Sequence, residues 1–158
     1  MKIVILGGTG QIGTFLAHHY LVQGHEVVVI GRKPQQQPWR TAVWDGETLG
    51  GWASEMDGAD VVINLAGRSV NCRYTAQNRR DIMNSRVNST LVVGKAIAQA
   101  NRPPRLWLQA STATIYAHRY DAPNDEFTGT LGGDEPNVPE TCLLPVNTQS
   151  TISPASPV

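Results

Sequence analysis

The sequence predicts an α/β fold in which a parallel β-sheet carries helices on both faces. Short β-branched runs alternate with helical patterns from residue 2 to residue 110. A glycine-rich turn, GGTGQIG (Gly7–Gly13), joins the first apolar run to the first helical pattern. Such alternation is typical of βαβ units with right-handed crossovers. The length, 158 residues, is that of one domain.

The first part of the chain predicts three strands and one helix. Lys2–Leu6 (KIVIL) and Glu26–Ile30 (EVVVI) are continuous apolar runs, which favours strands buried on both faces. Residues 11–23 predict a helix that ends at Gly24. The residues expected on its buried face are Ile12, Phe15, Leu16 and either His19 or Tyr20. After an irregular loop with two prolines, Thr41–Trp44 predicts a third strand.

The next part repeats the alternation. Trp52–Met56 predicts a weak helix, and Val61–Leu65 (VVINL) predicts a fourth buried strand. Gln77–Asn101 predicts a long amphipathic helix. Arg105–Ala110 (RLWLQA) predicts a fifth strand that contains Trp107.

The composition changes after residue 120. We expect residues 1–120 to form the domain and residues 121–142, which are polar and rich in Gly and Pro, to be irregular. Residues 143–158 carry no charge, contain three prolines and show neither helical nor strand periodicity, so we expect a disordered tail. The predicted sheet is therefore doubly wound, stops after its fifth strand, and is followed by an irregular C-terminal tail.

Charge and cysteine content argue against several classes of function. Lys plus Arg and Asp plus Glu both number 13, which gives no electrostatic case for binding nucleic acid or an anionic membrane. Cys72 and Cys142 stand far apart, as free thiols of a reducing compartment do, and we expect a cytoplasmic protein without a membrane span. His18 and His19 point in different directions on a helix and have no further ligands nearby, so no metal site is predicted.

The glycine turn predicts a phosphate-binding site. Gly7 allows the tight turn, Gly10 lets the backbone approach a pyrophosphate, and Gly13 lets the helix pack closely. The start of the helix, with Gln11 and Ile12, offers free N–H groups and a partial positive charge. Because the turn follows a buried strand and opens a helix, it indicates a Rossmann-type dinucleotide site. The alternative is a strand-to-helix turn that uses glycine for its dihedrals alone.

The end of the second strand favours NADP over NAD. NAD sites usually place Asp or Glu here, where it binds the ribose 2′-hydroxyl. This sequence has Arg32 and Lys33 instead, which can bind a 2′-phosphate. The alternative is that both residues begin an ordinary solvated loop. Asp45, just after the third strand, is a candidate contact for the adenine amino group.

Three motifs together resemble the extended short-chain dehydrogenase/reductase superfamily. They are GGTGQIG, DVVINLAG (Asp60–Gly67) and STATIYA (Ser111–Ala117). With SRVNST they are most similar to the atypical "epimerase family protein" branch, which is nucleoside-diphosphate-sugar epimerase-like. The resemblance covers residues 1 to about 141. It implies a Rossmann-type sheet that holds a nicotinamide dinucleotide, and a C-terminal lobe that binds a sugar-nucleotide-like substrate.

The resemblance also implies roles for single residues. Asn64, Leu65, Ala66 and Gly67 would line the cofactor, or alternatively form a buried structural turn.

Further residues correspond to the substrate side of the site. Thr112, with Ser111 beside it, would polarise a substrate oxygen, or alternatively cap the strand end. Tyr116 would shape the substrate cavity, or serve packing alone. Arg86 stands where many relatives carry an active-site Asn.

Catalysis is where the chain departs from the superfamily. Active members carry Tyr-x-x-x-Lys after the fifth strand, and no tyrosine here has Lys four places on. Relatives continue after residue 142 into a substrate lobe, and we expect this chain to end instead as a truncated product, or alternatively in a genuine short disordered tail. Three hypotheses follow: an NADP-dependent epimerase or oxidoreductase, a binding or sensing module without turnover, and an inactive fragment with an exposed sheet edge. The sequence predicts no oligomeric state.

Overall fold

The computed structural model describes residues 1–33, 36–111, 116, 117 and 119–130. Within these residues the strands form one five-stranded parallel sheet in the order β3-β2-β1-β4-β5. In chain order, the elements are β1 (Lys2–Leu6), α1 (Gln11–Val22), β2 (Glu26–Gly31), β3 (Arg40–Val43), the 3₁₀ helix η1 (Gly51–Met56), β4 (Val61–Asn64), α2 (Ala76–Ala98) and β5 (Leu106–Gln109). The predicted α/β class, the number of strands and their parallel direction are confirmed.

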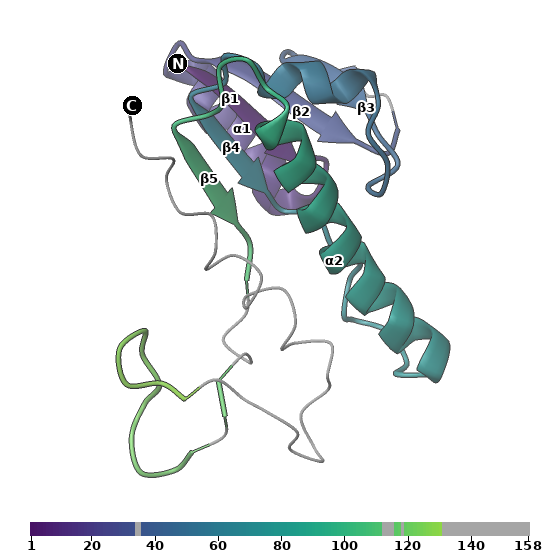
Figure 1. Cartoon of the computed structure of the whole chain (residues 1–158), viewed down its shortest axis with the longest axis vertical. Helices are drawn as coiled ribbons and strands as arrows, with labels where there is room; N and C mark the ends of the chain where they lie inside the picture. The colour runs from purple at the N-terminus through teal and green to yellow at the C-terminus, as the bar shows by residue number, and fades with distance from the viewer. Residues whose placement is uncertain (34–35, 112–115, 118, 131–158) are drawn as a thin grey trace.

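The central strand β1 is buried because both faces of the sheet are covered (Figure 1). Ile3 and Ile5 face a cluster completed by α1, whereas Val4 and Leu6 face a second cluster completed by η1 and α2. Alternate residues of a strand point to opposite faces, so a strand apolar at every position is what this two-sided core requires. This explains the unbroken KIVIL and EVVVI runs.

The predicted buried face of α1 is partly wrong. Leu16 and Tyr20 pack against the core, but Ile12 and Phe15 are 69% and 72% exposed. The fully buried positions are Gly13 and Ala17, one turn apart. Because Gly13 must face the turn after β1, it fixes the rotation of the helix and directs Ile12 and Phe15 outward.

Helix α2 places its first half beyond the sheet. The Thr75 side chain caps the helix by accepting a hydrogen bond from the Asn78 backbone N–H. From there α2 runs back along the face that holds Val62 and Trp107. Its N-terminal half extends past the carboxyl ends of the strands (Figure 1). Asp81, Asn84 and Ser85 of this half line the candidate site described below.

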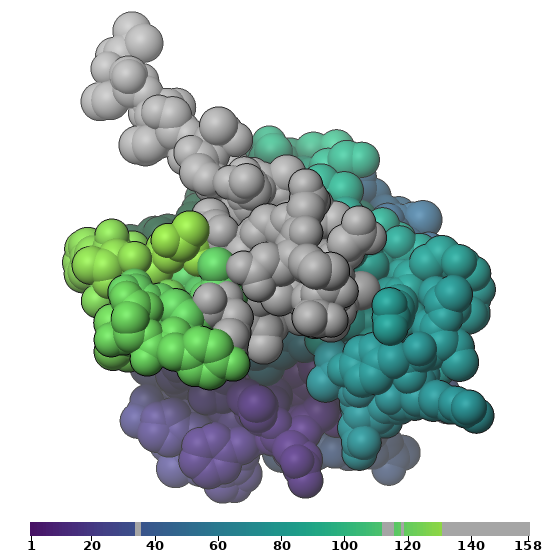
Figure 2. Space-filling view, turned by 90° about the horizontal axis from the view of Figure 1, so that it is seen from below, coloured from purple at the N-terminus to yellow at the C-terminus, as the bar shows by residue number. Residues whose placement is uncertain are grey.

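Strand β5 forms one end of the sheet within the described residues. Register pairing with β4 puts Leu106 and Leu108 on the same face as Ile63, and both leucines are about half exposed. Viewed from below (Figure 2), the loop before α2 and the start of α2 (teal) lie on the right, and the described residues 119–130 (green to yellow) lie on the left. None of the helices in the described ranges has the length and hydropathy needed to cross a membrane.

Candidate functional site

The turn after β1 depends on glycine at Gly7. Its φ is +68°, and a Cβ there would lie 2.7 Å from the backbone nitrogen of Ala66. The Gly7 N–H also continues the sheet ladder by donating to the carbonyl of Ile30 at 2.8 Å. Gly7 therefore brings the turn after β1 against the loop after β4.

Gly13 brings α1 against the same turn. A Cβ on Gly13 would lie 2.3 Å from the Cα of Gly8, a separation that no real side chain shows. Gly10 differs, because a Cβ there would meet nothing closer than the Gly7 carbonyl oxygen, 3.9 Å away. The turn therefore needs Gly13 for packing, whereas at Gly10 it leaves the backbone open toward the cavity.

A cavity of about 510 Å³ lies along the carboxyl ends of the strands and begins at this turn. Its walls come from the turns after β1, β2, β3 and β4 and from one face of α2. The lining residues are Gly7, Thr9, Gly10, Gly31, Arg32, Trp44, Asp45, Gly46, Glu47, Leu65, Ala66, Gly67, Arg68, Asp81, Asn84, Ser85 and Ser89. Ligands of open α/β sheets bind in this position, where strand order reverses around β1 and β4.

One end of the cavity is built by the turns after β2 and β3. Gly31 pairs with Val43 in the sheet, so the next residues, Arg32 and Trp44, begin side by side. Arg32 is exposed and makes no hydrogen bond or ion pair in the described part of the chain. Its guanidinium is therefore available to a ligand.

The loop after Trp44 is held in shape by Asp45. The Asp45 carboxylate accepts hydrogen bonds from the Thr48 hydroxyl and from the backbone N–H groups of Thr48 and Glu47. These bonds, that of the Thr48 hydroxyl first, lower the pKa of Asp45 to about 2. Asp45 is thus ionised near neutral pH, and its oxygens are engaged by its own loop.

The loop after β4 forms the middle of the cavity. Leu65, Ala66 and Gly67 line it, but the Asn64 side chain is fully buried beneath them. Asn64 accepts from the Ala66 N–H at 3.0 Å and donates to the Gln109 side chain at 2.9 Å. With both functions of its amide engaged, Asn64 supports the loop from below.

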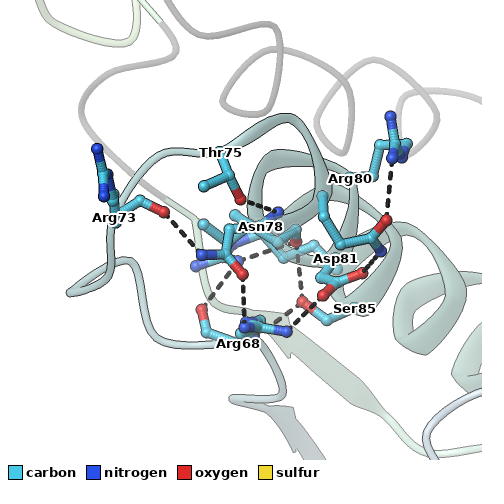
Figure 3. Close-up of polar contacts among 10 residues, drawn as sticks. Arg68, Arg73, Thr75, Asn78, Arg80, Asp81 and Ser85 are labelled. Atoms are coloured by element: carbon cyan, nitrogen blue, oxygen red, sulfur yellow. Dashed lines mark hydrogen bonds and ion pairs between the residues drawn. The ribbon is translucent and has the colours of Figure 1, made fainter.

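A polar network fixes the following segment on α2 (Figure 3). The Arg68 guanidinium donates to Asp81 and Asn78, and the Arg68 backbone N–H donates to the Ser85 hydroxyl. Asn78 in turn donates to the Arg73 carbonyl. Residues 68–75 are therefore tied to the first turns of α2.

Arg86 supports the same segment from behind. Its Nη1 donates to the carbonyls of Arg68 and Ile82, at 3.2 and 3.1 Å. A Cβ on Gly67 would lie 3.3 Å from the Arg86 guanidinium carbon. Arg86 does not line the cavity, so its contacts position Gly67 and Arg68, which do.

We expect Asp81→Ala to loosen this segment at little cost in stability. The Arg68–Asp81 pair is substantially exposed, and such pairs are worth about 0–1 kcal/mol. Amide hydrogen exchange over residues 68–75 should accelerate, while the free energy of unfolding falls by less than about 1 kcal/mol. Asp121→Ala, which removes the comparably exposed pair with Arg119, is the matched control. Equal exchange in this segment in the wild type and Asp81→Ala would show that the ion pair does not hold it.

The structure gathers part of the predicted set in the cavity. The predicted residues that line it are Gly7, Gly10, Arg32, Leu65, Ala66 and Gly67, and Asp45 lines it too. The predicted residues that do not line it are Gln11, Ile12, Gly13, Lys33, Asn64, Arg86, Ser111 and Tyr116. Thr112 lies outside the described residues. The Tyr116 ring packs against Gly129, where an added Cβ would lie 2.6 Å from it.

The lining residues outside the predicted set are Thr9, Gly31, Trp44, Gly46, Glu47, Arg68, Asp81, Asn84, Ser85 and Ser89. Asp81, Ser85 and Ser89 lie at positions i, i+4 and i+8 of α2, a polar stripe that helical periodicity could have revealed. Gly31 ends β2, and Trp44, Gly46 and Glu47 follow β3, and none of these four belongs to a motif. Thr9 belongs to the glycine turn but was not assigned a role.

Comparison with known proteins agrees with this architecture. Residues 3–139 match the model of the NAD dependent epimerase/dehydratase family. The bovine "Epimerase family protein SDR39U1" is 33% identical over 85% of this chain, and "Epimerase family protein YfhF" of Bacillus subtilis is 31% identical over 85%. The crystal structure of human epimerase family protein SDR39U1 (isoform 2) with NADPH has 30% identity and a TM-score of 0.66 over 77% of this chain.

The matched region is only part of those proteins. The chain spans 44% of the bovine relative, 45% of the Bacillus relative and 40% of the human structure. The family match nevertheless covers most of the present sequence, from the first strand through the segment after β5. The chain therefore belongs to the NAD dependent epimerase/dehydratase family.

Proposed function

We propose that this chain binds NADP(H) in the cavity along the carboxyl ends of the strands. The observation that carries the proposal is the geometry of the glycine turn. Gly10 borders the cavity with open space where a side chain would stand, at the N-terminus of α1. A pyrophosphate can therefore approach the backbone N–H groups and the positive end of the helix.

Arg32 supports NADP(H) over NAD(H). It borders the cavity after β2, where the ribose of a dinucleotide lies in Rossmann-type domains, and its donors are free of partners among the described residues. A guanidinium can form paired, charge-assisted hydrogen bonds with a 2′-phosphate. The human relative was solved with NADPH, which supports the same choice.

The chemistry that we propose beyond binding is that of the family. A bound nicotinamide cofactor would supply hydride transfer, and we propose a sugar-nucleotide-like substrate. Within this chain, Leu65–Gly67 and the anchored segment from Arg68 would hold and orient the dinucleotide. Ser111 follows β5 at the same edge of the sheet, and Thr112 next to it remains the proposed residue for polarising a substrate oxygen. Binding without turnover is the function proposed for the present residues, since no Tyr-x-x-x-Lys pair is present in this sequence.

A fluorescence titration with NADPH and NADH tests the proposal. We expect saturable binding with NADPH preferred, and we expect Arg32→Glu to weaken NADPH binding by about tenfold to a hundredfold. The estimate follows because a hydrogen bond to a charged group is worth about 1.5–3 kcal/mol, and Glu adds repulsion. The affinity for NADH, which lacks the 2′-phosphate, should fall by a smaller factor.

Arg105→Glu is the matched control, because Arg105 is exposed and lies away from the cavity. It should leave both affinities unchanged. Failure of the folded wild-type chain to bind either nucleotide would refute the proposal. Binding of NADP⁺ without its reduction to NADPH in the presence of UDP-sugars would support the role as a binding module.

A further inference from the structure

The cavity that Arg32 lines also contains a carboxylate that no nucleotide-binding motif predicts. Glu47 belongs to the loop after β3 and lines the same cavity as Arg32, which follows β2. The register of the two strands places these loops next to each other, because Gly31 pairs with Val43 and the Trp44 N–H donates to the Gly31 carbonyl at 3.1 Å. Arg32 and Glu47 therefore line the same cavity from neighbouring loops.

Asp45 and Glu47, the two acidic residues of this loop, differ in whether their carboxylates are free to bind a ligand. Both oxygens of Asp45 accept hydrogen bonds from Glu47 and Thr48, so its charge is used within the loop. The Glu47 side chain is exposed and has no hydrogen bond or ion pair in the described ranges. Its backbone N–H is held by Asp45, and Gly46 (φ +87°) makes the bend before it. Glu47 thus presents a free carboxylate on a constrained backbone.

Arg32 and Glu47 favour different nucleotides. A carboxylate beside the adenine ribose accepts a hydrogen bond from the 2′-hydroxyl of NAD(H) and repels the 2′-phosphate of NADP(H). In many NAD sites this acid ends the second strand, whereas here that place is taken by Arg32. The loop after β3 can supply the missing acid from the neighbouring strand.

We infer that Glu47 is a second specificity determinant of this site and acts against Arg32. Arg32 attracts the 2′-phosphate, while Glu47 weakens that attraction and stabilises a 2′-hydroxyl. The site therefore accepts both dinucleotides. The ratio of its affinities for NADP(H) and NAD(H) is smaller than Arg32 alone would give. This inference rests on the proposed dinucleotide binding at the same cavity.

The test is a set of titrations of the full 158-residue chain with NADPH and NADH. The proteins are the wild type, Glu47→Gln, Arg32→Ala and the double variant. Glu47→Gln should strengthen NADPH binding about threefold to tenfold and weaken NADH binding about twofold to fivefold, since it removes one charge beside the ribose. The gain for NADPH should shrink near 1 M salt, where charges are screened beyond about 3 Å. The factor by which Glu47→Gln strengthens NADPH binding should not be the same in the Arg32→Ala background as in the wild type, because both residues act on one phosphate.

Glu126→Gln controls for the loss of a negative charge, because Glu126 is exposed and lies outside the cavity. It should leave the ratio of the two affinities unchanged. An unchanged ratio in folded Glu47→Gln, with Arg32-dependent NADPH binding intact, would overturn the role of Glu47 and leave the proposed function standing. Absence of binding of both nucleotides to the wild type would overturn the proposed function and this inference together.

Discussion

Gly13→Ala should destabilise the fold by about 3 kcal/mol or more and abolish dinucleotide binding. The added methyl would lie 2.3 Å from the Gly8 Cα and 2.6 Å from the Gly8 carbonyl carbon and oxygen. These are backbone atoms in the turn after β1, so no side-chain rotation relieves the overlap. Helix α1 would have to move away from the turn, taking its N-terminal N–H groups out of position.

The higher helix propensity of alanine opposes this loss of stability, and the control variant is chosen to measure it. Alanine is favoured over glycine inside a helix by about 1 kcal/mol, which is less than the cost of overlap with backbone. Gly94 is also helical, and a Cβ there would lie 3.6 Å from the Trp107 ring, an ordinary contact. Gly94→Ala should therefore leave stability unchanged or raise it by up to about 1 kcal/mol.

Chemical denaturation of both variants, followed by an NADPH titration, gives the measurement. Loss of stability in Gly13→Ala together with unchanged or increased stability in Gly94→Ala is the expected result. Equal stability of Gly13→Ala and the wild type would show that α1 does not need its close approach to the turn.

The sequence was sufficient for the elements of this fold because both of its signals are local. Continuous apolar runs mark strands covered on both faces, and the glycine turn marks the junction of β1 and α1. The rotation of α1 was not predictable from apolar spacing, since Gly13, which has no hydrophobic side chain, decides which face is buried. Ile12 and Phe15 consequently fall on the exposed face.

The cavity was predictable only where a motif describes it. Gly7, Gly10 and Arg32 belong to a strand–turn–helix pattern and its neighbouring strand end, so their positions follow from the chain itself. Glu47 and Asp81 line the cavity because β3 and α2 bring distant segments to one edge of the sheet. That arrangement is tertiary. The periodicity of α2 can show that Asp81 belongs to a polar stripe, but it cannot show that this stripe and the loop after β3 line one cavity.

Asn64→Leu should cost about 2–4 kcal/mol of stability and also disturb the cavity. The Asn64 side chain is completely buried and holds two neighbours, the Ala66 N–H of the cavity loop and the Gln109 side chain of β5. Leucine is close in size and more apolar, which favours the variant. It leaves a donor and an acceptor without partners, however, at about 1–3 kcal/mol each. The cost of the two unpaired polar groups therefore exceeds the stability gained by burying a more apolar side chain.

The same substitution separates a supporting role from a simple stability effect. Asn64 joins the loop that lines the cavity to the end of β5, where the Ala110 N–H donates to the Asn64 carbonyl at 2.9 Å. Amide exchange should therefore accelerate at Ala66 and Ala110 more than in α1, and NADPH affinity should fall in the variant that remains folded. Asn101→Leu, an exposed position, should change none of these quantities. Uniform acceleration of exchange across the whole sheet would instead mean that Asn64 contributes to global stability alone, because a local support must protect the loop it holds more than a distant helix.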